Sequence, residues 1–192
     1  MFHNDDMVLI TDEQQILRIE GQLKQIVEGT FQEGLKIYKR ERLLAMPVES
    51  GAHFDEMDKI RLAHAVQIGG NTILYASALE FPDHIPRLLA FPPTINGIER
   101  FDKECATYNY VLFLDTTMFV VLCLIEDFYV MIGSQDFIEQ SIGASLDEGY
   151  ATFYTYASFA DWPPLIRQRL LSIYHLLKED YTNAQPGSYV LL

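Results

Sequence analysis

Five side chains of the kinds that bind metals or transfer protons lie close together in the sequence: His53, Asp55, Glu56, Asp58 and His64. Histidine and carboxylate groups can hold a divalent metal ion, or form a pair in which one orients the other as a base. Their spacing matches no established motif, because H-E-x-x-H is absent. Acidic residues are also favoured in the first turn of a helix, and His64 among apolar neighbours is typical of a core histidine.

The catalytic site is therefore unknown from the sequence, and His53, Asp55 and His64 are the nearest to catalytic candidates that it offers. No metal site and no cofactor are expected, since neither phosphate-binding glycine motif occurs. Ser134 follows a glycine but lacks the closing glycine of G-x-S-x-G, so a helix cap explains it better. The two cysteines match no redox or zinc spacing, and Cys123 is predicted to be buried and inert.

A dense aromatic stretch offers a second kind of site. Six aromatic residues lie within thirteen positions: Tyr150, Phe153, Tyr154, Tyr156, Phe159 and Trp162. Such a group can line a ligand pocket, form an energetic hot spot for a protein partner, or simply pack a helix on a sheet. The binding candidates are Tyr150, Tyr154 and Trp162.

The element that organises the chain is the stretch 108–132, where three apolar runs are separated by Asp115-Thr116-Thr117 and Glu126-Asp127. The runs are rich in Val, Ile, Phe and Tyr, which predicts a three-stranded antiparallel meander. Because the first two runs hardly alternate with polar residues, both faces of this sheet should be covered.

Helices are predicted on both sides of this meander. Apolar residues from Ile16 to Tyr38, behind a capping box at Thr11, indicate a long N-terminal helix. Its three glycines suggest either close packing against another element or a break near Gly29 or Gly34. A second helix is expected from Asp55 to Ile68, with Met57, Ile60, His64 and Ile68 on one face.

The region between these helices and the meander is predicted to be mostly irregular. Pro47 and Ser50-Gly51 predict a loop. The stretch 72–79 is either a fourth strand or a helical turn, and strand is favoured. Four prolines make 81–98 a long connection with at most one helical turn near Arg87.

After the meander, Ser134 and Gly143 predict a short capped helix. A capping box at Ser145 predicts a helix over 146–159, and the prolines after Trp162 start another that ends near Asp180. The expected fold is a single α+β domain over 1–192: 11–70 mainly helical, 71–143 the sheet region and 144–181 the C-terminal helices. The sheet should have three or four antiparallel strands, covered by helices from both ends of the chain.

The net charge of −13 repels nucleic-acid backbones and anionic membranes and attracts basic partners, although acidity can also serve solubility alone. The start of the chain lacks a basic signal-peptide region, and no apolar run approaches membrane-spanning length, so a cytoplasmic protein is expected. Two functions follow. The first is a non-catalytic interaction or regulatory module that binds a protein partner or itself as a homodimer. The alternative is an enzyme or small-ligand-binding protein with a pocket between 81–98 and the sheet.

Overall fold

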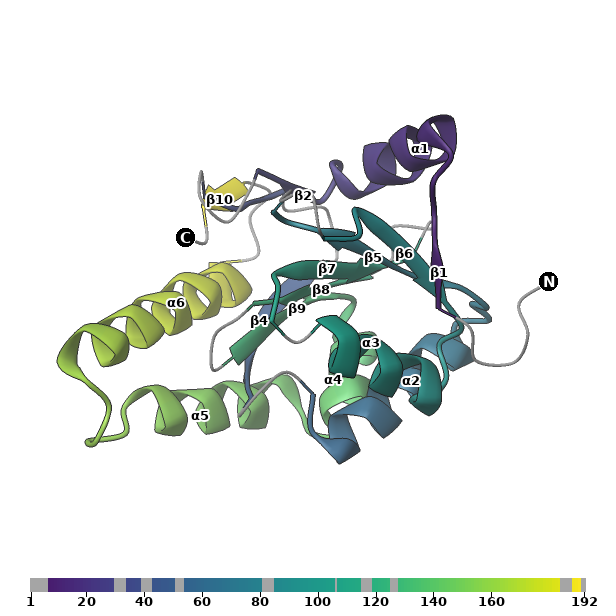
Figure 1. Cartoon of the computed structure of the whole chain (residues 1–192). Coiled ribbons are helices and arrows are strands. Elements are labelled where there is room, and N and C mark those ends of the chain that lie inside the picture. The colour runs from purple at the N-terminus through teal and green to yellow at the C-terminus, as the bar shows by residue number, and fades with distance from the viewer. Residues whose placement is uncertain are drawn as a thin grey trace.

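The computed structural model describes residues 7–29, 34–38, 43–50, 54–80, 85–105, 107–114, 119–124, 128–183 and 188–190. Within these ranges the chain forms a seven-stranded sheet, a three-stranded sheet and six helices (Figure 1). The predicted α+β class is confirmed. The predicted sheet of three or four strands is too small, because strands on both sides extend the central meander.

All pairings in the large sheet are antiparallel, and its strand order is β1-β6-β5-β7-β8-β9-β4. Its strands are β1 (Val8–Leu9), β4 (Leu44–Glu49), β5 (Leu74–Ala78), β6 (Leu88–Phe91), β7 (Tyr110–Phe113), β8 (Phe119–Cys123) and β9 (Phe128–Gly133). The small sheet pairs β10 (Ser188–Val190), β3 (Lys36–Tyr38) and β2 (Val27–Glu28) in that order. The predicted meander is thus β7, β8 and β9.

The helices are α1 (Glu13–Leu23), α2 (Glu56–Ile68), α3 (Ile95–Cys105), α4 (Gln135–Ile142), α5 (Leu146–Ala157) and α6 (Pro164–Asn183). In Figure 1, α2, α3 and α4 lie on one side of the large sheet, whereas α1 and the small sheet lie on the other. Side chains on both faces of the central strands are therefore removed from water, and every residue of β7, β8 and β9 is buried.

The long N-terminal helix is the first prediction that the structure corrects. The helix starts after Asp12 rather than Thr11 and ends at Leu23, and the apolar residues that follow belong to β2 and β3. Gly29 has a φ of 104°, a left-handed backbone conformation that a helix cannot contain. The stretch 11–70 therefore holds strands β2 to β4 as well as α1 and α2.

Two further corrections concern prolines. The expected loop around Pro47 is strand β4, which lies at the edge of the sheet, where a residue without an N–H is tolerated. The expected irregular connection 81–98 contains strand β6 and the start of α3, and its residues 81–84 lie outside the described ranges. The strand predicted within 72–79 is confirmed as β5.

The caps predicted at Ser134 and Ser145 are confirmed. Ser134 accepts a hydrogen bond from the Phe137 amide and starts α4, which Gly143 ends with a φ of 69°. Ser145 and Glu148 form the capping box of α5. Helices α5 and α6 then make a hairpin whose inner part packs on β4 and whose outer part projects beyond the sheet (Figure 1).

The central strand β8 provides a direct test of this core. Replacing Leu122 by alanine should cost about 2–5 kcal/mol of unfolding free energy, because Leu122 is fully buried and its truncation leaves a cavity. Chemical denaturation measures this cost. Cys123, which is 2% exposed, should react with a thiol reagent far more slowly in the native than in the unfolded protein. A cost below about 1 kcal/mol, or rapid native labelling, would contradict the two-sided burial of β8.

Candidate functional site

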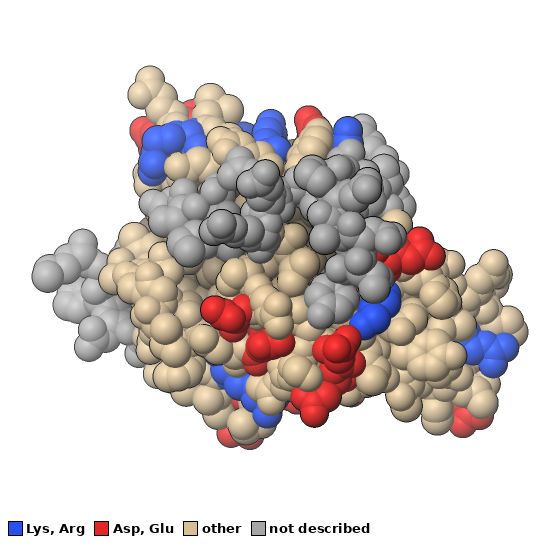
Figure 2. Space-filling model, turned by 180° about the vertical axis from the view of Figure 1, so that it is seen from behind, with Lys and Arg blue, Asp and Glu red and all other residues tan. Residues whose placement is uncertain are grey.

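Acidic residues dominate a long part of the chain. Between Lys103 and Arg167 the sequence has no Lys or Arg but nine acidic residues: Glu104, Asp115, Glu126, Asp127, Asp136, Glu139, Asp147, Glu148 and Asp161. Figure 2 views the molecule from behind and shows Asp and Glu side chains gathered below the centre of that face, beside the projecting hairpin. Such a face attracts cations and repels anions.

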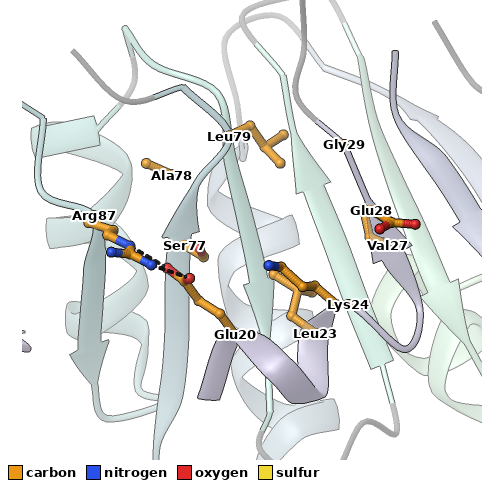
Figure 3. Close-up of a pocket in the computed structure, with 10 residues that line it drawn as sticks. All are labelled: Glu20, Leu23, Lys24, Val27, Glu28, Gly29, Ser77, Ala78, Leu79 and Arg87. Atoms are coloured by element: carbon orange, nitrogen blue, oxygen red, sulfur yellow. Dashed lines mark hydrogen bonds and ion pairs between the residues drawn. The ribbon is translucent and has the colours of Figure 1, made fainter. Parts of the chain in front are cut away.

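A cavity beside the 81–98 connection lies between α1 and strands β2 and β5, and has a volume of about 380 Å³ (Figure 3). Two of the charged side chains in its lining, Arg87 and Glu20, pair with each other. The Arg87 guanidinium donates two hydrogen bonds to the Glu20 carboxylate, at 2.8 and 2.7 Å, and a third to Glu13 at 3.2 Å. Glu20 is buried, so this bidentate pair ties α1 to the sheet.

A second cavity, of about 200 Å³, lies between β4, α2, α4 and α5. More of the charged side chains that line it are negative than positive. Three carboxylates line it: Glu49 at the end of β4, Asp55 at the N-cap of α2 and Asp58 in the first turn of α2. Its apolar wall consists of Met46, Val48, Ile142 and Phe153. This cavity is named the acidic pocket below.

Asp58 is the unusual member of the acidic pocket because it is only 9% exposed. Burial raises the pKa of its carboxyl group above the ordinary value, and the nearby charge of Asp55 acts in the same direction. The Tyr129 hydroxyl, the Asp55 backbone and the Arg61 charge oppose this rise only in part. A buried carboxylate whose charged form is disfavoured is the kind of group that functional sites retain.

Two cations lie near Asp58 in the sequence, but other groups engage them. Arg61 donates a hydrogen bond of 2.8 Å to the Ile142 carbonyl at the end of α4, where a cation complements the helix dipole. Lys59 forms an ion pair of 2.7 Å with Asp102 of α3. Among the described residues, Asp58 has no ion-pair partner.

The Tyr129 hydroxyl completes this arrangement. Tyr129 is 1% exposed, and its ring packs on Phe54 with centroids 5.0 Å apart. Burial and the nearby Asp58 hold its pKa well above the ordinary value, so it stays a hydrogen-bond donor at neutral pH. It lies near enough to Asp58 to influence the pKa of that group, yet makes no hydrogen bond of good geometry to any described residue.

The catalytic candidates from the sequence do not come together as one site. His53 lies outside the described residues. Asp55 caps α2 by accepting the Asp58 amide at 2.7 Å, and it also lines the acidic pocket. His64 is exposed on the outer face of α2, so the expectation of a core histidine is wrong.

That outer face explains the error. Met57, Ile60, His64 and Ile68 do share one face of α2, but all of them are exposed. The inward face instead carries Asp58, Leu62, Ala65 and Val66, at helical spacing. Sequence reasoning included Asp58 in the cluster but attributed it to the first turn of the helix and did not select it as a candidate. The periodicity that Asp58 shares with buried apolar residues is the signal that could have selected it.

The three aromatic binding candidates lie in different environments. Tyr150 is buried, and its hydroxyl lies 2.7 Å from the Ala45 carbonyl of β4 and 3.1 Å from the Leu177 carbonyl of α6. Trp162 is partly buried and donates a hydrogen bond of 2.9 Å to the Tyr156 carbonyl. Tyr154 is 46% exposed. Tyr150 and Trp162 therefore stabilise the hairpin, whereas Tyr154 is exposed to solvent.

The outer end of the α5–α6 hairpin exposes further apolar side chains. Phe159 is 56% exposed, Leu165 81% and Ile166 40%. These three residues and Tyr154 are called the hairpin tip. Clustered exposure of large apolar residues marks interaction surfaces on soluble proteins.

Metal and membrane sites were also sought. No group of three His, Cys, Asp or Glu side chains in the described ranges is placed to hold a metal ion, and the lack of a cofactor stays a prediction. In the same ranges no helix is long and apolar enough to cross a bilayer. Comparisons with protein-family models, curated proteins and solved structures found no match to this chain.

The acidic pocket leads to a prediction about stability. Replacing Asp58 by asparagine should raise the melting temperature at pH 7, by roughly 2–4 °C for each kcal/mol that ionisation of Asp58 costs. Because its pKa is raised in the folded state, the folded protein holds this proton more tightly than the unfolded chain. Stability is therefore lost as the pH rises from about the ordinary value of 3.8 through the raised value.

Thermal melts of both proteins between pH 4 and pH 7 test this, and the advantage of Asp58→Asn should shrink toward pH 4. Glu99→Gln removes the same charge from an exposed position on α3 and should change the melting temperature little. If Asp58→Asn lowers the melting temperature at pH 7, the carboxylate stabilises the fold and is not a strained site group.

Proposed function

We propose that the protein is a non-catalytic interaction module and that the hairpin tip is where it binds a protein partner. The observation that carries this proposal is the exposure of Tyr154, Phe159, Leu165 and Ile166 on a hairpin whose base is firmly held. The base is fixed by the buried Tyr150 hydroxyl and by a 3.0 Å ion pair between Lys178 and Asp147. Rigid aromatic and aliphatic side chains on a held element bind at low entropic cost.

The partner is expected to carry apolar residues beside Lys and Arg. Helix α5 lies within the stretch 104–166, which has no Lys or Arg, and contributes Asp147 and Glu148, whereas α6 adds Arg167 and Arg169 after the tip residues. A second copy of this chain fits less well, because each copy carries a net charge of −13 and would bring its acidic stretch against the other. Charge complementarity thus favours a different, basic protein over a homodimer.

The alternative function, a small-ligand protein or enzyme, would use the 380 Å³ cavity beside Arg87. A charged ligand there would have to replace the hydrogen-bonded pair between Arg87 and Glu20. Breaking a buried pair leaves one charge without compensation, which is costly. The hairpin tip requires no such rearrangement, so the interaction function is preferred.

The prediction is that Phe159→Ala weakens binding to the partner by about 2 kcal/mol, or roughly 30-fold, because a central aromatic anchor is lost. Proteins cross-linked to the purified chain in cell extract would be identified, and the affinity of the purified pair would then be measured by calorimetry. Leu165→Ser should weaken the same complex. Both changes should leave unfolding free energy within about 0.5 kcal/mol, since the side chains are exposed.

Leu17→Ser is the matched control, because Leu17 is 58% exposed on α1, away from the hairpin. It should bind the partner as the unchanged protein does. Equal affinity of the Phe159→Ala protein would contradict the proposal. A dimer in light scattering that Phe159→Ala dissociates would replace the basic partner by a second copy of this chain.

A further inference from the structure

We propose that the acidic pocket binds a lysine or arginine side chain of the protein partner. This inference rests on the proposed function. It names the kind of side chain that the partner would insert into the acidic pocket beside the hairpin. The pocket is adjacent to the hairpin, because Gly149, Thr152 and Phe153 of α5 form one of its walls. One partner segment can therefore contact both.

The size and lining of the pocket fit a basic side chain. Its volume of about 200 Å³ is below the roughly 300–1,000 Å³ of pockets that hold whole small molecules. The apolar wall of Met46, Ile142 and Phe153 suits the methylene stem of Lys or Arg, whose charged end then meets the carboxylates. Amphipathic side chains of this kind need both types of lining together.

The carboxylates of the pocket outnumber the one cation in its lining, Arg61. Glu49, Asp55 and Asp58 have no ion-pair partner within the described part of the chain, and Asp58 is more than nine-tenths buried. Arg61 also lines the pocket and its charge acts on Asp58, but it donates a hydrogen bond to the neutral Ile142 carbonyl, and one cation does not balance three carboxylates. A basic side chain from outside would supply the missing charge to Asp58.

Tyr129, which lies beside Asp58 but is not part of the pocket lining, is the second observation. Its buried hydroxyl beside Asp58 has no hydrogen-bond partner of good geometry among the described residues. Buried donors are rarely left unpaired in folded proteins. When a cation draws the Asp58 carboxylate into a fixed position, that carboxylate can accept the Tyr129 hydrogen bond as well, so one ligand satisfies both groups.

The test uses N-acetyl-arginine amide and N-acetyl-lysine amide as probes, followed by the amide signals of Gly149 and Thr152 in NMR spectra at low salt. Saturable shifts are expected, with a dissociation constant on the order of 1 mM for ligands of this size. N-acetyl-citrulline amide has the same shape as the arginine probe without its charge, and it should bind at least about 10-fold more weakly.

Asp58→Asn should weaken binding of the arginine probe at least about 10-fold, whereas Glu99→Gln should leave it unchanged. Failure of the charged probes to shift these signals, or equal binding of the citrulline probe, would overturn the inference. The two proposals can fail separately. If Phe159→Ala abolishes partner binding while Asp58→Asn binds both the partner and the probe normally, the proposed function holds, and no basic side chain enters the acidic pocket.

Discussion

Burial of β7, β8 and β9 on both faces is the constraint on which the rest of the structure depends. Side chains of a strand alternate between the two faces of a sheet, so apolar residues at every position require a covering layer on each side. Helices α2, α3 and α4 supply one layer, and α1 with the small sheet supplies the other (Figure 1). The Glu20–Arg87 pair then fixes α1 in its layer by hydrogen bonds.

The edge of the same sheet accounts for the hairpin. An edge strand leaves backbone groups unpaired and invites association with other chains. In β4, Pro47 removes one donor, and the Tyr150 hydroxyl lies at hydrogen-bond distance from the Ala45 carbonyl. Packing on β4 holds only the inner part of α5 and α6, because the sheet ends there. Apolar residues farther out on the hairpin are not covered by any of the described elements and remain exposed.

Elements set by local chemistry could be predicted from the sequence, whereas elements set by the sheet could not. The meander and the caps at Ser134 and Ser145 depend on neighbouring residues, and they were predicted correctly. Strand β4 contains Pro47, and strand β6 follows several prolines, so both resemble loops until an edge position or a pairing partner is known. The residues after Leu23 keep a helix-like spacing, but pairing between β2 and β3 overrides it.

The acidic pocket shows why sequence reasoning can overlook a candidate site residue. A structural role accounts at first sight for the acidic residues at the start of α2. Acidic residues in the first turn of α2 suit the helix dipole, and this explanation is sufficient for Asp55 and Glu56, which are exposed. It is not sufficient for Asp58, because a dipole interaction of less than about 1 kcal/mol requires no burial. The carboxylate of Asp58 lies instead on the inward face of the helix, beside the buried Tyr129 hydroxyl, where burial disfavours its charged form. Natural sequences retain such local costs chiefly where a function needs them, and a cation delivered by a partner is the function that fits this charge.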